Sequence, residues 1–110
     1  MQSAVKFSED GGMLTASLSG EIDHHTAKGQ REEIDAMLFR ARPESLVIDF
    51  SEVKFMDSSG IGLIIGRAEV CEALGCNICI TGLSETLYKL VRLSGIEKIK
   101  CLNVKNGVYK

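Results

Sequence analysis

Hydrophobic and polar residues follow two different periods along this chain, and each change of period marks a boundary between predicted elements. Apolar residues alternate with polar ones over residues 5–7 and again over 14–18, as in strands that bury one face. The turn-forming residues 9–12, Glu-Asp-Gly-Gly, separate them and indicate a β-hairpin. Residues 45–50 are almost continuously apolar, which is typical of a strand buried on both faces. Two further strands are predicted, over residues 77–81 and 99–102.

Apolar residues at helical spacing predict three helices between these strands and a short fourth one at the C-terminus. Polar N-cap residues accept hydrogen bonds from the free N–H groups at a helix start, and glycine takes the left-handed conformation at a helix end. The second helix has three good N-cap candidates, Asp57, Ser58 and Ser59, and needs only one of them. The predicted helices are residues 23–40 with Asp23 as N-cap, a second from the turn at 55–62 to Leu74 with Gly75 as its C-terminal cap, a third from the cap Ser84 to Gly95, and residues 104–110.

The order of these elements predicts an α/β fold with a mixed sheet. An N-terminal antiparallel hairpin joins parallel β-α-β units, and the helices pack against the sheet. With 110 residues, of which 45% are hydrophobic, the chain is long enough for one domain with a real core. In such sheets, ligands and partners meet the loops at the carboxyl ends of the strands. Those loops are Gly20–Thr26, Met56–Gly62 and Gly82–Ser84, and the first two should lie side by side on one rim.

Charge and hydropathy argue against two classes of partner. The formal net charge of −2 disfavours broad binding to nucleic acid. The sequence has no apolar run of 18 residues, and its N-terminus lacks the hydrophobic segment of a signal peptide. We therefore expect a cytoplasmic protein that binds neither nucleic acid nor membrane.

Cysteines and histidines are the candidate metal ligands. Cys71, Cys76 and Cys79 have C-x4-C-x2-C spacing, with Cys101 farther on, which matches a plant-type iron–sulfur pattern. However, Cys71 falls on the apolar stripe of a predicted helix and Cys79 lies inside a predicted strand, whereas cluster ligands usually come from a loop. The two adjacent histidines point in different directions on a helix and have no third ligand. The sequence predicts free buried cysteines, no metal and no cofactor.

The serines at the start of the second helix do not fit a hydrolase. An esterase nucleophile elbow needs glycine two residues before the serine, but Ser58 has Met56 there and Ser59 has Asp57. Neither serine is followed by a histidine that could act as a base. The sequence also lacks a Walker loop and a G-x-G-x-x-G motif. We therefore expect no catalytic residues and a protein that is not an enzyme.

Ser58 needs fewer neighbouring groups to accept a phosphate than to act as a catalytic nucleophile. It needs an exposed hydroxyl that a kinase can reach, at a place where about −1.5 to −2 units of charge change binding. The helix N-terminus favours a phosphate, whereas the neighbouring Asp57 repels it. These opposed terms predict that the fold survives phosphorylation while the surface potential changes. From these residues alone, a well-capped helix with no further role is the simpler interpretation.

Two blocks of the sequence resemble the bacterial anti-sigma factor antagonists, which are STAS domains of the kind also found in sulphate transporters. The first block is Gly20–Ala27, GEIDHHTA, and the second is Phe55–Arg67, FMDSSGIGLIIGR. Their separation and the order of strands and helices also agree, so the resemblance covers nearly the whole chain. It implies a single STAS domain over residues 1–110 with an α/β fold.

The resemblance also implies a regulatory cycle. An unphosphorylated antagonist of this kind binds an ATP- or ADP-bound anti-sigma factor that is also a serine kinase, and so releases a sporulation sigma factor. The kinase phosphorylates the first serine after the aspartate, which is Ser58 here, and a serine phosphatase reverses this inactivation. In the family, Asp23 lies near that serine and contributes to partner binding. The residues expected to bind the partner are Asp23, His24, Thr26, Met56, Asp57, Ser59, Gly60, Ile61 and Gly62.

Two features leave alternatives open. Related domains have been linked to nucleotide binding, and Gly60 and Gly62 could admit a phosphate, so a small-ligand-binding domain is the alternative function. Gly62 and Gly66 also stand inside the second helix, where each glycine costs about 1 kcal/mol relative to alanine. Close approach of a partner and packing inside the domain would both explain them.

Overall fold

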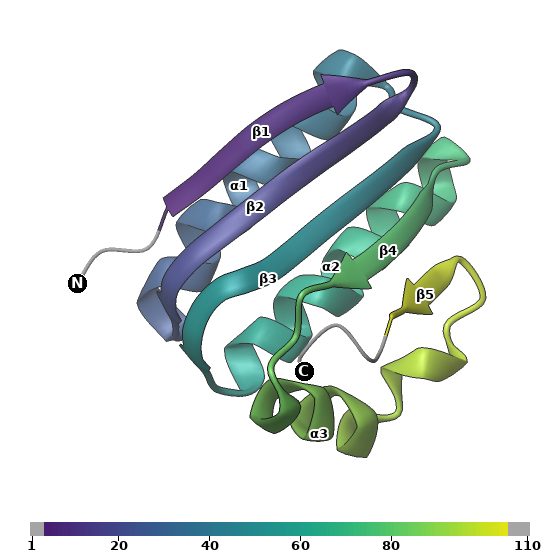
Figure 1. The fold of residues 1–110 in the computed structure, drawn as a ribbon. Helices are drawn as coiled ribbons and strands as arrows, with labels where there is room; N and C mark the ends of the chain where they lie inside the picture. The colour runs from purple at the N-terminus through teal and green to yellow at the C-terminus, as the bar shows by residue number, and fades with distance from the viewer. Residues whose placement is uncertain (1–3, 106–110) are drawn as a thin grey trace.

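The structure, a computed structural model, describes residues 4–105. They form a five-stranded sheet in the order β1-β2-β3-β4-β5, in which β1 and β2 are antiparallel and the other neighbours are parallel. The predicted mixed α/β sheet is confirmed, and Figure 1 shows α1 and α2 lying side by side behind it. The elements are β1 (Ala4–Asp10), β2 (Met13–Ile22), α1 (His24–Ala41), β3 (Ser45–Met56), α2 (Ser58–Leu74), β4 (Asn77–Thr81), α3 (Glu85–Ser94), the short 3₁₀ helix η1 (Ile96–Lys98) and β5 (Leu102–Val104).

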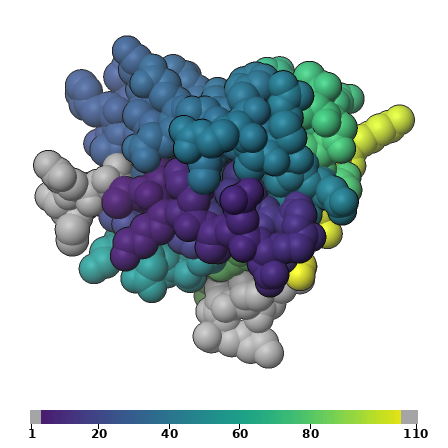
Figure 2. All heavy atoms as spheres, turned by 90° about the horizontal axis from the view of Figure 1, so that it is seen from above, coloured from purple at the N-terminus to yellow at the C-terminus, as the bar shows by residue number. Residues whose placement is uncertain are grey.

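The core lies between the sheet and the two long helices. Alternate residues of the three central strands are buried there, because successive side chains of a strand point to opposite faces. The intervening residues, such as Val47 and Asp49, lie on the other face and are only half-buried. The prediction that residues 45–50 of β3 are buried on both faces is therefore wrong. The sequence suggested it because Val47, on the half-buried face, makes the apolar run almost continuous. Seen from above, α1 and the β1–β2 hairpin form adjoining layers (Figure 2). The buried strand residues are Leu14, Ala16, Leu18, Leu46, Ile48, Phe50, Ile78 and Ile80.

β3 extends six residues beyond the predicted end at Phe50 and reaches Met56. It stays paired with β2 along this extension, with irregular register between Ser17 and Ser19 and between Gly20 and Glu21. The last pair joins Ile22 to Met56. Because the two strands are parallel and end together, the loops that follow them emerge at the same edge of the sheet. The expectation that these two loops lie side by side is thus confirmed.

The C-terminal part differs from the prediction. β5 covers Leu102–Val104 instead of residues 99–102, because the chain turns before it. The N–H of Ile99 donates to the C=O of Ile96, and the N–H of Leu102 donates to the C=O of Ile99. Val104 belongs to β5, so the predicted terminal helix does not begin there. Residues 106–110 of that prediction lie outside the described residues.

Candidate functional site

The starts of α1 and α2 meet at one end of the sheet, which we call the rim and define as residues 20–26 and 56–62. A backbone hydrogen bond ties its two segments together: the N–H of Asp57 donates to the C=O of Ile22 over 3.2 Å. Each helix begins directly after an aspartate, Asp23 for α1 and Asp57 for α2. The two caps are therefore neighbours across parallel strands that lie far apart in the sequence.

Asp23 is held firmly by the first turn of α1. Its carboxylate accepts hydrogen bonds from the N–H groups of His25 and Thr26, over 2.9 and 3.0 Å. In return, the N–H of Asp23 donates to the hydroxyl of Thr26, which completes a capping box. The hydrogen bond from the Thr26 backbone is the largest cause that lowers the pKa of Asp23 below its ordinary value. The rim therefore carries a fixed negative charge near neutral pH.

The start of α2 leaves a hydroxyl free. Of the three N-cap candidates, Asp57 is the cap, and its carboxylate accepts the N–H of Ser59 over 2.8 Å. Ser58 is the first residue of the helix and is exposed. Within the part of the chain that the structure describes, its hydroxyl makes no hydrogen bond. An exposed serine at a helix N-terminus is the geometry that a phosphoacceptor needs.

Three of the nine residues expected to bind a partner lie beneath the surface of the rim. Met56 is 4% exposed, Ile61 is 9% exposed, and Gly60 is also buried. A Cβ on Gly60 would collide with the side chain of Met56. Glycine is thus required at residue 60 because α2 starts directly over that buried methionine. These three residues shape the rim, while the exposed and half-buried ones, among them Gly62, can meet a partner directly.

A groove of about 320 Å³ runs between α1 and α2 next to the rim. We call it the α1/α2 groove; it is lined by His24, Ala27, Lys28 and Arg31 of α1 and by Ser59, Gly62 and Leu63 of α2. The sequence patterns above do not single out Lys28 or Arg31. The signal that could have found them is their spacing from His24, at four and seven residues, which places all three on one helix face.

A largely buried ion pair joins the two helices one turn beyond this groove. Arg67 Nε lies 2.7 Å from Asp35 Oδ1, and Arg67 is only 4% exposed. Burial lowers the pKa of Arg67 from its ordinary value, and the Asp35 carboxylate opposes that shift. Loss of Asp35 would leave a buried guanidinium without its counter-charge, which is strongly destabilising. The pair therefore fixes the spacing of the helices that form the groove.

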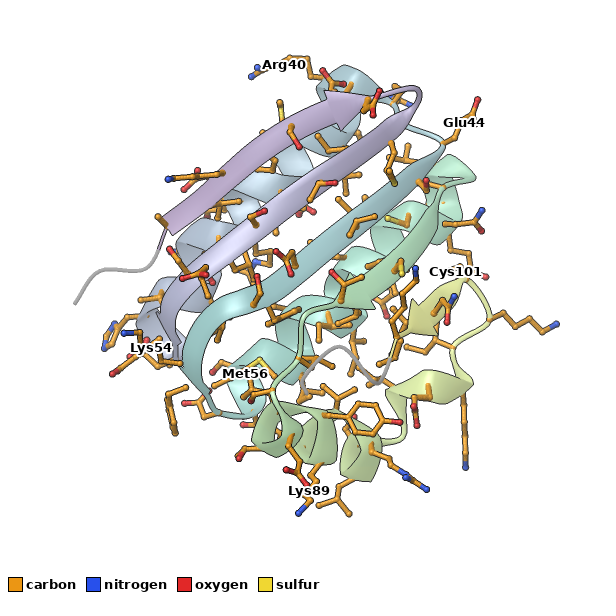
Figure 3. The ribbon with its side chains drawn as sticks, viewed as in Figure 1. Arg40, Glu44, Lys54, Met56, Lys89 and Cys101 are labelled. Carbon is orange, nitrogen blue, oxygen red and sulfur yellow. The ribbon has the colours of Figure 1, made fainter. Side chains whose placement is uncertain are left out.

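A second hollow, of about 350 Å³, lies on the other side of the α2 start. Its walls come from the end of β3 and from α3, so the third predicted loop, Gly82–Ser84, also reaches this region. Phe55 is 51% exposed at its edge. Figure 3 shows Lys54 and Met56 at this end of the molecule, while Arg40 and Glu44 lie at the opposite end. The lining residues are Lys54, Phe55, Met56, Ser84, Thr86, Leu87 and Leu90.

The possible metal ligands do not gather into a site within residues 4–105. No three of their histidine, cysteine or acidic side chains are arranged to hold a metal ion. All four cysteines are free, but the prediction that they are buried holds only for Cys71 and Cys76, since Cys79 and Cys101 are half-buried. Burial raises the pKa of the Cys71 thiol. The rings of His24 and His25 lie 5.8 Å apart, edge to face. Over the same range, no helix has the length and apolar character to cross a membrane.

Comparison with known proteins identifies the class to which this fold and rim belong. The sequence profile of the STAS domain matches residues 4–109, and the chain belongs to the STAS domain family. The anti-sigma F factor antagonist of Paenibacillus polymyxa is 32% identical over 99 residues, which cover 90% of this chain and 85% of that protein. The anti-sigma-B factor antagonist of Listeria monocytogenes is 31% identical over 91 residues, covering 81% and 75%. The family expected from the two sequence blocks is therefore confirmed.

A solved structure shows the same fold. The phosphorylated form of the Bacillus cell fate determinant SpoIIAA matches with a TM-score of 0.70 and 27% sequence identity. The match covers 94% of this chain and 93% of that one. A relative with this fold is thus known in a phosphorylated state.

Proposed function

We propose that this protein is an anti-sigma factor antagonist, a regulatory binding protein without catalysis of its own, which binds an anti-sigma factor through the rim. The observation that carries the proposal is the exposed hydroxyl of Ser58, which makes no hydrogen bond with the described residues and stands at the aspartate-capped start of α2, beside the aspartate-capped start of α1. The names of the Paenibacillus and Listeria relatives support the class of partner. The protein acts in the cytoplasm, where sigma factors and their regulators meet, as a single domain over residues 1–110.

Phosphorylation of Ser58 is the proposed switch. The partner is an anti-sigma factor with serine kinase activity, which uses ATP to transfer a phosphoryl group to the Ser58 hydroxyl, and a serine phosphatase removes it. The modified serine would carry up to two negative charges beside Asp57 and the ionised Asp23. A partner surface that fits a neutral hydroxyl would meet like charges there, at a cost of several kcal/mol. The unphosphorylated form is therefore the one that binds and releases the sigma factor.

The proposed interface uses the rim residues in two ways. Asp23, Thr26, Asp57 and Ser59 are half-buried and His24 and Gly62 are exposed, so a partner can reach all six. Met56, Gly60 and Ile61 support the surface from beneath, as their burial requires. The relatives are named as antagonists of an anti-sigma F factor in one case and of an anti-sigma-B factor in the other, and the resemblance favours a sporulation sigma factor for this chain.

The test is a binding and modification experiment with the anti-sigma factor of the organism that encodes this chain. We expect a complex with the unmodified protein, displacement of the sigma factor, and transfer of one phosphate on addition of ATP, read by intact mass and site mapping. Ser58→Ala should still bind and should not be modified, whereas Ser59→Ala keeps the acceptor hydroxyl and should still take up one phosphate, on Ser58. Phosphate incorporation into Ser58→Ala at the wild-type level would assign the switch to another residue.

Nucleotide binding is the second candidate function, and the α1/α2 groove is the observation that favours it. Lys28 and Arg31 could pair with phosphate groups beside Ser59. The groove is at the small end of the range for ligand sites, about 300–1,000 Å³, and His24 is its only ring that could stack on a base. Calorimetric titration of the chain with ATP and GTP in the absence of any partner tests this function directly.

A further inference from the structure

We infer that the α1/α2 groove is a docking site for an acidic segment of the partner, whose Asp or Glu side chain pairs with Lys28 and Arg31. This inference rests on the proposed function, because the segment belongs to the protein that binds the rim. It adds a second contact region, on the flank of α1, to an interface that the sequence patterns placed only in the loops.

The first support is the charge of the groove. Lys28 and Arg31 are exposed and lie one turn apart on α1. Among the described residues neither makes an ion pair; the one ion pair in that range joins Asp35 to Arg67. Glu32 and Asp35 follow Lys28 and Arg31 by one turn on α1, but neither forms an ion pair with them, and Asp35 is already paired with Arg67. The groove therefore presents two cations that no carboxylate of the described residues pairs with.

The second support is the shape of the groove. The wall formed by α2 carries Gly62, where a Cβ would find no atom within 4 Å, and the wall formed by α1 carries the short Ala27. Small residues on both walls leave a space of about 320 Å³. This volume is enough for one or two side chains of a partner loop and is smaller than a single helical turn, which is about 5.4 Å long and about 10–12 Å across.

The third support is continuity with the rim. His24 and Ser59 belong both to the rim and to the lining of the groove. A partner seated over Ser58 thus reaches Lys28 and Arg31 without a separate surface. The carboxylates of Asp23 and Asp57 in the rim are engaged as helix caps, whereas the two cations of the groove are unpaired among the described residues, so the groove is the part of the interface that attracts an acidic residue. Such a charge pair fixes the orientation of a complex and speeds association.

The experiment compares two double charge reversals that change the net charge equally. Lys28→Glu with Arg31→Glu places two carboxylates in the groove. Arg40→Glu with Lys100→Glu is the control, since both residues are exposed and Arg40 lies at the opposite end of the molecule from the rim (Figure 3). We expect the groove variant to bind the anti-sigma factor more than about thirtyfold more weakly than the wild type, and the control less than about threefold. Thermal unfolding of both variants confirms that they are folded at the temperature of the assay.

Two further arms identify the occupant. Raising the salt concentration should weaken the wild type more than the Lys28→Ala/Arg31→Ala variant, since screening acts on the charge pairs that this variant lacks. An Asp or Glu→Lys substitution in the partner that restores binding to the groove variant identifies the acidic residue and supports the inference. Equal affinities for the groove variant and the control overturn it.

The remaining outcomes are also separable. If wild-type protein does not bind the anti-sigma factor at all, the proposed function fails, and the wild-type arm alone shows this. If the isolated chain binds ATP, and the groove variant loses ATP binding but keeps its affinity for the anti-sigma factor, the groove is a nucleotide site and the inference is overturned.

Discussion

The helices α1 and α2 share the same type of N-cap residue but differ in the hydrogen bonds of their first turns. Both N-caps are aspartates on neighbouring parallel strands, Asp23 and Asp57. In α1 the third residue is Thr26, whose hydroxyl accepts the N–H of the cap and closes the capping box. In α2 the third residue is Gly60, which has no side chain, so no box forms. One helix start is closed by a capping box, whereas at the other the Ser58 hydroxyl is exposed and makes no hydrogen bond with the described residues.

The reason for this difference lies under the second helix start. Met56 is buried directly below Gly60, and a Cβ at residue 60 would collide with it. A hydroxyl-bearing residue at the third position is therefore excluded by core packing. An aspartate cap is thus completed by a capping box at α1, where the core leaves room for Thr26, and stays without one at α2, where the core leaves no room at Gly60. The following predictions test that contrast, beginning with the largest effect.

Phosphorylation of Ser58 should lower the affinity for the anti-sigma partner by more than about a hundredfold, with the fold intact. Loss of one interfacial hydrogen bond costs only about 0.5–1.5 kcal/mol, or roughly tenfold. A dianion beside Asp57 also adds charge to a surface that fits a neutral hydroxyl, and like-charge juxtaposition of this kind costs several kcal/mol. Binding measurements on the purified phosphoprotein give the affinity.

Amide exchange separates this charge mechanism from local unfolding. Outside residues 55–62, exchange and circular dichroism of the phosphoprotein should match the unmodified form. Widespread loss of protection in α2 would show that the switch acts by unfolding, and the charge argument would then be wrong.

Gly60→Thr should destabilise the protein by about 2 kcal/mol, because it copies the third residue of α1 into a place without room. Overpacking a buried site typically costs about 1–3 kcal/mol. Gly62→Thr is the matched control, since nothing lies within 4 Å of a Cβ at that residue. Denaturant unfolding compares the two variants. Equal stabilities would mean that Met56 can move aside, and that core packing does not keep the second helix start open.

The capping-box hydrogen bond at the start of α1 should contribute more to the stability of the protein than the Ser58 hydroxyl at the start of α2 does. Thr26→Val keeps the shape of the side chain but removes the hydroxyl from the capping box, at a cost of about 1 kcal/mol. Ser58→Ala should cost less than this, because its hydroxyl makes no bond with the described residues. Unfolding curves for the two variants, measured side by side, test the difference, and a larger loss for Ser58→Ala would reverse the comparison.

Because Asp23 caps α1 in its ionised form, its contribution to the stability of the protein should decrease as the pH falls. Its pKa is lowered in the fold, so the carboxylate binds a proton less readily than in the unfolded chain. Its contribution to stability is present above the ordinary value of 3.8 and is lost as the pH falls through the lower folded value. Asp23→Asn keeps a capping oxygen without the charge. The stability advantage of the wild type over this variant should therefore shrink between about pH 5 and pH 2.

The caps and the element order could be predicted from sequence because each depends on a few consecutive residues. Asp23, Ser84, Gly75 and Gly95 cap their helices as expected. The meeting of the two loops at one rim also follows, since parallel strands connected by helices place their ends together. The extension of β3 could not be predicted: within 51–56 the buried residues are Val53 and Met56, three apart, which breaks the alternation that marks a strand.

The α1/α2 groove depends on how two helices pack. The spacing of His24, Lys28 and Arg31 places them on one face of α1, but it does not show that α2 lies beside that face. From the sequence, Lys28 and Arg31 are typical of the solvent-exposed face of a helix; only the packing of α2 against α1 shows that they line a groove. Likewise, three residues could cap α2, and only the structure selects Asp57 and leaves Ser58 free. Helix caps that depend on local hydrogen bonds can thus be predicted from the sequence, whereas a surface formed by two packed helices cannot.

The last prediction concerns Gly62 and Gly66, for which partner approach and internal packing were both open. A Cβ at either residue would find nothing within 4 Å among the described atoms, so neither glycine is required for packing inside the domain. Alanine at each should therefore stabilise the free protein by about 0.5–1 kcal/mol, through helix propensity. Thermal unfolding measures this gain, and a loss of stability in either variant would restore the packing explanation.

Binding then distinguishes the two glycines, because only Gly62 lines the α1/α2 groove. A methyl group there takes up space that the partner needs, and we expect Gly62→Ala to bind about five- to tenfold more weakly, equivalent to about 1 kcal/mol. Gly66→Ala, with the same gain in helix propensity, should bind like the wild type and serves as the matched control. Because the more stable Gly62 variant would be the weaker binder, the result would show that an open helix surface at the rim is kept at the expense of stability. Equal binding by both variants would show instead that the partner does not reach this wall of the groove.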